Sequence, residues 1–99
     1  MNTGIVYALY YDGKPFYIGQ TKRRLWDRYK DHKKETFNGN NLRLYRYIRS
    51  VVDKEEDFQY LIHIKKISET TVDKLDDLEV EYIRLCKKSN IKIYNTLYN

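Results

Sequence analysis

The stretch Tyr17-Ile18-Gly19-Gln20-Thr21 leads directly into a basic segment that continues to His32. This pattern predicts a short strand that ends in a glycine turn, followed by a helix over residues 22–35. Arg24, Arg28 and His32 are spaced four residues apart and therefore line up on one side of that helix. A tyrosine, an arginine and a histidine would then meet in one place, where they could bind a phosphate, neutralise its charge and move a proton.

The residues before this stretch predict a partner strand for it. Residues 4–11 are β-branched and aromatic, which is typical of a strand. The next four residues, Asp-Gly-Lys-Pro, have turn chemistry, and a return strand follows them. The sequence therefore predicts a β-hairpin over residues 4–19. Tyr7 and Tyr17 lie on its two strands, so their rings can approach each other if they share a face.

The rest of the chain predicts two further helices and one further strand. Residues 42–52 and 72–88 carry apolar residues at helical spacing, and residues 58–67 alternate between two faces as a half-buried strand does. Residues 68–71 read as the start signal of the last helix, and residues 91–95 as a short extended tail. The sequence thus predicts three helices and three strands.

Length, composition and charge indicate one small basic domain over residues 1–99. Apolar residues make up 41% of the chain and charged residues 33%, and the net charge is +5, which fits a folded globular domain. The positive charge is concentrated in a run of seven Lys and Arg residues: Lys22, Arg23, Arg24, Arg28, Lys30, Lys33 and Lys34. Arg43 and Arg46 extend it. Such a run is either a solvated helix face or a surface that attracts a polyanion such as nucleic acid.

The cysteine content and the hydropathy limit where in the cell we expect the protein. The single cysteine, Cys86, excludes an intrachain disulfide and a metal site built from cysteines. No signal-peptide pattern is present, and no apolar run approaches the roughly 18 residues of a membrane span. We expect a cytoplasmic protein that does not enter the membrane.

Glu79 is the acidic residue whose position is the most informative. Helical spacing places it inside the apolar stripe of the last helix, bracketed by Leu75 and Ile83. A carboxylate there is costly unless it is paired, hydrogen-bonded or bound to a metal. Mg²⁺ needs as little as one carboxylate. Glu79 therefore either binds a divalent cation or lies at the edge of the stripe, where it snorkels to solvent or pairs with a lysine.

The sequence leaves the choice of a general base open. A tyrosine hydroxyl has an ordinary pKa of about 10, so Tyr7 becomes a base only if nearby cations or a metal stabilise its anion. Arg28 is the permanent cation best placed to do so, and it could also stabilise a pentacovalent phosphate. His32, one turn further along the helix, could shuttle a proton.

Five short motifs occur in a fixed order along the chain: Gly4-Ile5-Val6-Tyr7, Tyr17-Ile18-Gly19, Arg28 with His32, Leu78-Glu79-Val80-Glu81-Tyr82-Ile83, and Tyr94-Asn95. In this order and at this spacing they resemble a GIY-YIG nuclease domain over nearly the whole chain. The first motif departs from the family pattern, because Gly-Ile-Val-Tyr stands where the family usually has Gly-Ile-Tyr. We align Tyr7 as the motif tyrosine, which puts Gly4 one place early.

The resemblance implies a small mixed α/β (α+β) domain with a three-stranded antiparallel sheet flanked by about three helices. It also implies metal-dependent hydrolysis of a DNA phosphodiester, with Mg²⁺ or Mn²⁺ as cofactor and Glu79 as the metal ligand. The implied catalytic residues are Tyr7, Tyr17, Arg28, His32, Glu79 and Asn95. Some family members carry another histidine in the loop that here reads Asn38-Gly39-Asn40-Asn41, and its absence shifts the role of general base toward Tyr7.

The partner expected from this resemblance is DNA. The residues predicted to bind it are Lys22, Arg23, Arg24, Lys30, Lys33, Lys34, Arg43 and Arg46. We expect a monomer to nick DNA with low sequence specificity, unless a homodimer or a separate specificity partner directs it. Two alternatives stay open: a catalytically inactive module of the same fold that binds nucleic acid or protein, and a small basic domain with an unrelated partner.

Overall fold

The computed structural model describes residues 2–95. Within that range the main elements are β1 (Thr3–Tyr11), β2 (Lys14–Thr21), α1 (Leu25–Phe37), α2 (Arg43–Val51), α3 (Phe58–Leu61), β3 (Ile62–Thr71) and α4 (Leu75–Lys88). Two single-turn 3₁₀ helices, η1 (Glu55–Asp57) and η2 (Val72–Lys74), precede α3 and α4.

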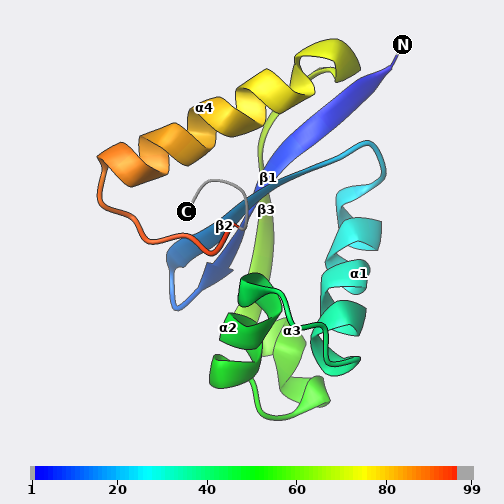
Figure 1. Cartoon of the computed structure of the whole chain (residues 1–99). Coiled ribbons are helices and arrows are strands. Elements are labelled where there is room, and N and C mark those ends of the chain that lie inside the picture. Colours follow the sequence, from blue (N-terminus) through cyan, green and yellow to red (C-terminus); the bar gives the residue numbers. More distant parts are fainter. Residues whose placement is uncertain (1, 96–99) are drawn as a thin grey trace.

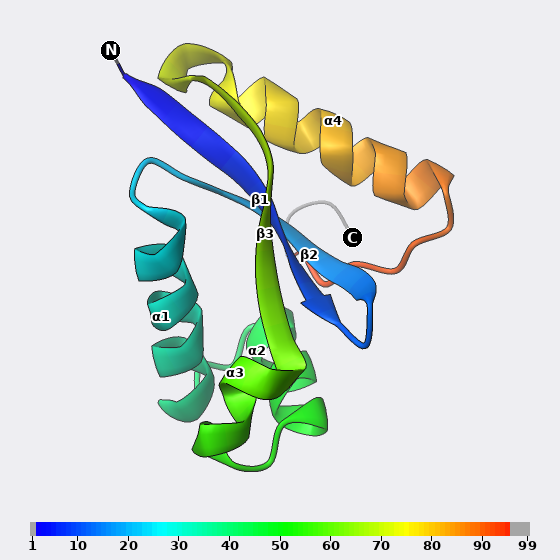
Figure 2. The same cartoon turned by 180° about the vertical axis from the view of Figure 1, so that it is seen from behind.

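The three strands form one antiparallel sheet in the order β2-β1-β3, so β1 is the central strand. In Figures 1 and 2, α4 crosses one face of this sheet, while α1 and α2 lie against the other face. The prediction of a small mixed α+β domain with a three-stranded antiparallel sheet is confirmed. The described part of the chain contains four α-helices rather than about three.

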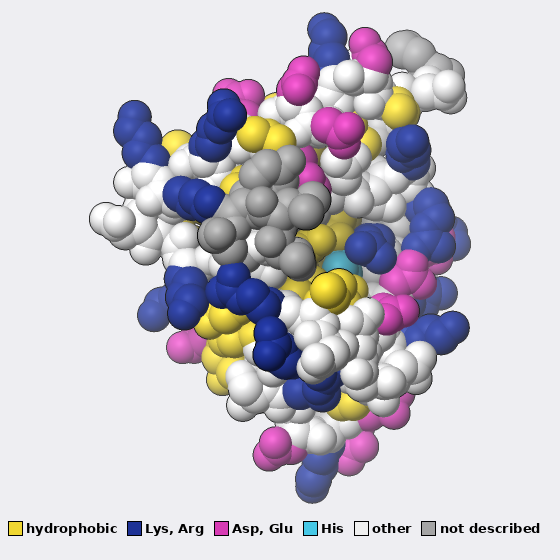
Figure 3. Space-filling view, viewed as in Figure 1, with side chains coloured by type: hydrophobic (Ala, Val, Ile, Leu, Met, Phe, Trp, Pro, Cys, Tyr) yellow, Lys and Arg dark blue, Asp and Glu magenta, His cyan; other side chains and the backbone are white. Residues whose placement is uncertain are grey.

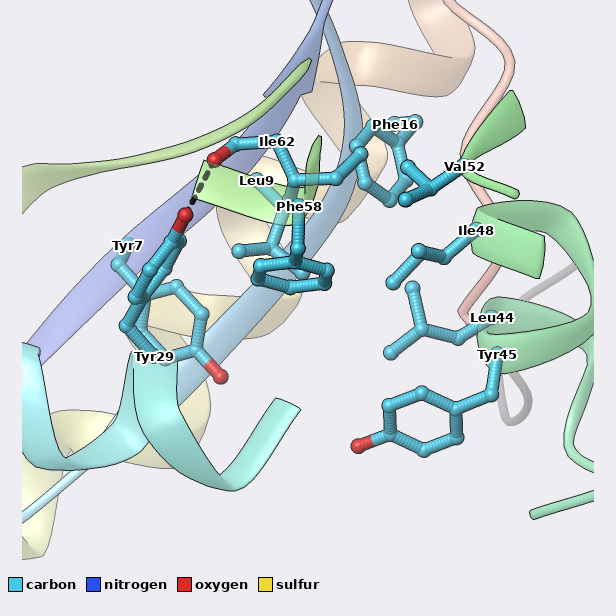
Figure 4. Close-up of a cluster of buried hydrophobic side chains, with 10 residues drawn as sticks. All are labelled: Tyr7, Leu9, Phe16, Tyr29, Leu44, Tyr45, Ile48, Val52, Phe58 and Ile62. Atoms are coloured by element: carbon cyan, nitrogen blue, oxygen red, sulfur yellow. Dashed lines mark hydrogen bonds between the residues drawn. The ribbon is translucent and has the colours of Figure 1, made fainter. Parts of the chain in front are cut away.

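Two hydrophobic clusters lie on the two faces of the sheet. The α1/α2 cluster, drawn in Figure 4, consists of Tyr7, Leu9, Phe16, Tyr29, Leu44, Tyr45, Ile48, Val52, Phe58 and Ile62. The α4 cluster consists of Val6, Ala8, Ile18, Leu75, Ile83, Cys86 and Ile93. Successive residues of β1 alternate between the two clusters, so this strand is buried on both faces. Its sequence is a continuous apolar run for that reason.

The predicted hairpin is present as β1 and β2. Asp12 and Gly13 join the strands with positive φ angles of 53° and 76°, as a tight two-residue hairpin turn requires. The strand pairing shifts by one residue at Phe16, which forms a bulge in β2. Because of this bulge, Phe16 and Tyr17 both pack toward the α1/α2 cluster.

The third strand begins later than the sequence predicts. The predicted strand covers residues 58–67, whereas β3 begins at Ile62. The preceding residues form α3, in which Phe58 is buried and Tyr60 is 69% exposed. Apolar residues four positions apart fit one helical turn as well as an alternating strand, so the pattern alone does not separate the two. This part of the prediction is wrong.

Two helix starts also differ from the prediction. Residues 68–71 are not a helix start but the end of β3, because they pair with the beginning of β1. The last helix, α4, therefore begins at Leu75 after the turn η2. The first helix, α1, begins later than predicted because the Thr21 hydroxyl accepts a 3.0 Å hydrogen bond from the Arg23 backbone N–H and holds that segment in a turn.

The helices are short. The longest, α4, has 14 residues. No helix in residues 2–95 has the length and apolar character needed to cross a membrane.

Candidate active site

Tyr7, Arg28 and His32 meet in one hydrogen-bonded cluster on the α1 side of the sheet. The side-chain Nε–H of Arg28 donates a hydrogen bond to the Tyr7 hydroxyl at 3.1 Å. His32 Nε2 lies 2.7 Å from the same hydroxyl. Arg28 and His32 are one helical turn apart on α1, and β1 places Tyr7 against that turn. These three predicted site residues are thus in direct contact.

A fourth residue, Tyr45 on α2, extends this cluster. Its hydroxyl lies 2.9 Å from His32 Nδ1, so the imidazole bridges two phenols through its two nitrogens. Tyr7 and His32 are fully buried, and Tyr45 is 4% exposed. Figure 4 shows the hydroxyls of Tyr7 and Tyr45 turned toward the space between β1 and α2. The contacts therefore run from Tyr45 through His32 and Tyr7 to Arg28.

The buried cluster is uncharged apart from Arg28. Burial, together with the charge of Arg28, lowers the pKa of His32 to about 3, so the ring is neutral at physiological pH. A neutral imidazole has one donor and one acceptor nitrogen, so it donates to one phenol and accepts from the other. Burial raises the pKa of Tyr7 far above its ordinary value and that of Tyr45 to about 12, while Arg28 opposes both shifts. Both phenols are therefore protonated.

Tyr17 lies beside Tyr7 on the neighbouring strand. The ring centres are 6.3 Å apart, and Gly19 permits this approach. A Cβ atom at Gly19 would lie 2.5 Å from the Tyr7 hydroxyl oxygen and 2.7 Å from Cε2 of Tyr17. Burial raises the pKa of Tyr17, and Arg28 opposes the rise. Tyr17 and Arg28 are partly exposed, so they form the open side of the cluster.

The glycine of the first motif has a different neighbour. A Cβ atom at Gly4 would lie 2.4 Å from Cδ2 of Leu75, so this glycine faces α4. Gly4 and Tyr7 are an odd number of residues apart on a regular strand, and alternation puts them on opposite faces. The inserted residue in Gly-Ile-Val-Tyr thus turns the motif glycine away from the motif tyrosine.

Glu79 comes from α4, on the opposite face of the sheet, and approaches the cluster at the edge strand β2. It is half-buried, and burial raises its pKa, while the Gln20 side chain on β2 opposes that rise. Gln20 Nε2 also donates a 2.6 Å hydrogen bond to Asp76 Oδ1. The negative charge of Glu79 raises the pKa of Tyr17. The charge of Glu79 therefore acts on Tyr17, although the helix that carries Glu79 packs on the other face of the sheet.

Asn95 uses its side-chain amide on the backbone of β2. The Ile18 N–H donates to Asn95 Oδ1 at 3.1 Å, and Asn95 Nδ2 donates to the Ile18 carbonyl at 2.5 Å. The neighbouring Tyr94 N–H donates to the Phe16 carbonyl at 2.8 Å. The tail thus pairs with the free edge of β2 on both sides of Tyr17. Asn95 holds the strand that carries Tyr17 in place.

The residues predicted to bind nucleic acid fall into two groups. Three of those before and on α1 form ion pairs with acids of the same segment: Arg23 with Asp31, Arg24 with Asp27, and Lys30 with Asp27. The other five form no ion pair within residues 2–95: Lys22, Lys33, Lys34, Arg43 and Arg46. The charge of the basic run is thus partly neutralised by its own acids, whereas the arginines of α2 stay available to an anion.

The donor chemistry around Glu79 suits a hard divalent cation. Glu79 has no ion-pair partner within residues 2–95, and Asp76 shares its neighbour Gln20. Within the same range, no group of three or more His, Cys, Asp or Glu side chains is placed to hold a metal. Mg²⁺ needs only one or two carboxylates when water and phosphate oxygens complete its coordination. Glu79 fits that kind of site, with Asp76, whose charge raises the pKa of Glu79, as a second carboxylate.

Tyr45 and Gln20 are functional candidates that the sequence prediction does not include. Tyr45 lies on the apolar side of α2, where amphipathic spacing predicts only core packing. The usable signal is indirect: once His32 is buried, each of its ring nitrogens needs a partner. Gln20 directly follows the second motif, and alternation along β2 sends it toward α4.

Comparison of this chain with protein-family models, with curated proteins and with solved structures gave no match. The resemblance to GIY-YIG nuclease domains therefore stays a prediction that rests on the five motifs.

Proposed function

We propose that this chain is a metal-dependent endonuclease that hydrolyses phosphodiester bonds in DNA, as its resemblance to GIY-YIG nuclease domains implies. One observation carries the proposal. Tyr7, Tyr17, Arg28 and His32 converge in one cluster, and the charge of Glu79 acts on that cluster through Tyr17. A guanidinium for the phosphate, phenols for positioning and proton transfer, and a carboxylate for a cation are the groups that such a hydrolysis needs.

Arg28 and Tyr17 are assigned to the phosphate because they are the partly exposed members of the cluster. The planar guanidinium of Arg28 donates to phosphate oxygens and stabilises the charge that develops on them. The Tyr17 hydroxyl orients the same phosphate. Glu79, with Asp76 nearby, would hold Mg²⁺ or Mn²⁺, which when bound supplies Lewis-acid stabilisation of the phosphate and the leaving oxygen.

Tyr7 is assigned as the proton acceptor for the attacking water, and His32 as its positioning partner. The low pKa of His32 disfavours a lasting imidazolium, so His32 holds the Tyr7 hydroxyl rather than storing the proton. Arg28 is the cation that favours the Tyr7 anion. Burial opposes that anion, so Tyr7 loses its hydroxyl proton to solvent on the open side of the cluster only when further positive charge enters the site. The attacking water enters beside Tyr17 and Arg28, on the open side of the cluster.

One such site cuts one strand, so we propose that a monomer nicks DNA and that double-strand cleavage requires two copies. Target choice then depends on DNA structure, on a homodimer or on a separate specificity partner. We place this activity in the cytoplasm.

The test is conversion of supercoiled plasmid to nicked circle, with and without Mg²⁺. We expect nicking with Mg²⁺ and none in EDTA. Glu79→Ala should abolish it, while Glu81→Ala, an exposed carboxylate on the same helix, should not. Absence of metal-dependent nicking by the wild type would refute the proposal. Salt-dependent DNA binding without cleavage would then favour an inactive binding module.

A further inference from the structure

A groove with aromatic and basic walls lies between the hairpin turn, α2 and the tail. Its main part has a volume of about 620 Å³, and its walls include Tyr47, Tyr94, Lys14 and Lys92. A shallower extension of about 310 Å³ shares the two tyrosines and continues along α2. None of these four residues belongs to the predicted site or to the predicted DNA-binding set.

The two tyrosines of the groove position two cations. The Tyr47 and Tyr94 rings stack with their centres 4.2 Å apart and their planes at 15°. The Arg43 guanidinium carbon lies 5.5 Å and the Lys92 Nζ 5.4 Å from the centre of the Tyr94 ring. Contacts of this kind attract cations to the ring face. Tyr94 is stacked on one tyrosine and covered by two cations. It therefore positions these two positive charges and leaves no open ring face on which a nucleobase could stack.

The positive charge of the groove is available to an anion. Lys14, Lys92, Arg43 and Arg46 form no ion pair within the described residues, and Asp12 is the only acid among the described lining residues. In Figure 3, Lys and Arg side chains gather in a band across the lower left of the view. An array of unpaired cations, two of them positioned by Tyr94, fits a chain of phosphates.

The groove adjoins the candidate active site through the tail. Tyr94 is hydrogen-bonded to Phe16 and the next residue, Asn95, to Ile18. These two β2 residues flank Tyr17, which faces the cluster. A strand whose reacting phosphate lies at Tyr17 and Arg28 therefore has its neighbouring phosphates within reach of the groove.

We propose that this groove binds the phosphate backbone of DNA next to the reacting phosphate and does so without reading base sequence. The inference rests on the proposed function for the identity of the ligand. What it adds is the route of the strand: over Arg43 and Lys92, and not mainly along the basic run of residues 22–34, where four of the seven cations are paired with acids.

The experiment measures binding of a labelled duplex oligonucleotide by fluorescence anisotropy in EDTA, so that no cleavage contributes. The groove variant is Arg43→Gln with Lys92→Gln. The matched control is Arg23→Gln with Lys30→Gln, which removes the same two positive charges from ion-paired positions. Thermal melting establishes that both variants fold. Titrations at several salt concentrations give the slope of log K against log salt.

We expect the groove variant to reduce this slope by about 1.8, because each phosphate contact contributes about 0.9. It should weaken binding by a similar factor on AT-rich and GC-rich duplexes. The control should change the slope by less than half as much. Equal losses in both variants, an unchanged slope in the groove variant, or a loss confined to one sequence would overturn the inference. If DNA binding depends on the groove residues but the protein does not cleave DNA with Mg²⁺, the proposed endonuclease function is refuted, whereas the inference that the groove binds the DNA backbone is retained.

Discussion

Gly19→Ala tests the geometry of the site with a single methyl group. The new Cβ would lie 2.5 Å from the Tyr7 hydroxyl oxygen and 2.7 Å from the Tyr17 ring, whereas ordinary contacts begin at 3.4 Å. Gly19 does not have a positive φ, so its backbone accepts alanine and the conflict is steric. The Tyr7 ring must shift by almost an ångström, which disturbs the geometry of its 2.7 Å contact with His32.

Two measurements follow this change. Overpacking of a buried site costs about 1–3 kcal/mol of unfolding free energy, which urea titration measures. A displacement of about 1 Å at a catalytic group costs of order 10²-fold in rate, which plasmid nicking measures. The matched control is Gly4→Ala, whose Cβ would lie 2.4 Å from Leu75 on the other face of the sheet. It should lose comparable stability and keep the nicking rate of the wild type. A folded Gly19→Ala protein with full activity, or an equal loss of activity in the control, would show that the close approach at Gly19 does not govern catalysis.

Four further predictions concern individual side chains. Arg28→Ala should lower the initial rate of plasmid nicking by about 10²–10³-fold, as the loss of one transition-state donor does; a loss below about tenfold would contradict its assignment. Folding stability should fall as the pH is lowered from about 6.5 toward 3, because the unfolded chain binds a proton that buried His32 excludes, at up to about 1.4 kcal/mol per pH unit. Urea titrations at several pH values should show that His32→Gln removes this slope, and an unchanged slope would count against the buried neutral ring. Tyr45→Phe should cost about 1–3 kcal/mol, because it leaves a buried nitrogen of His32 without a partner, whereas the exposed control Tyr60→Phe should cost almost nothing; equal costs would exclude this contact. Glu79→Gln should melt at a higher temperature than the wild type at pH 7 but not below about pH 4, because burial raises the pKa of Glu79 and destabilises only its ionised form; a lower melting temperature at pH 7 would show that the ionised carboxylate stabilises the fold.

Two parts of the site follow from local rules in the sequence. The Asp-Gly turn between two strand-like runs predicts the hairpin that carries Tyr7 and Tyr17. Strict alternation from that turn would put the two tyrosines on opposite faces, and the bulge at Phe16, which the sequence does not predict, brings them to the same face. Helical spacing puts Arg28 and His32 on one side of α1. These are short-range relations, in which a period of two or of 3.6 residues decides which side chains meet.

The remaining parts of the site depend on packing between distant elements. Tyr45 meets His32 only because α2 docks against α1, and neither helix carries a signal for that alignment. Glu79 lies on the predicted apolar stripe, but its approach to Tyr17 also depends on β2 being an edge strand. The start of β3 is mispredicted for a similar reason, since the exposed Tyr60 and the buried Phe58 are distinguished by tertiary contacts rather than by their apolar character.

We propose that a divalent cation binds at Glu79 beside the phenols. Paramagnetic broadening of NMR signals by Mn²⁺ tests it without relying on activity. In the wild type we predict that substoichiometric Mn²⁺ broadens the Gln20 side-chain amide and the Tyr17 backbone amide first, while that of Lys65 on β3 stays sharp. Glu79→Gln should abolish this selective broadening. Broadening centred elsewhere, or the same pattern in Glu79→Gln, would contradict the account.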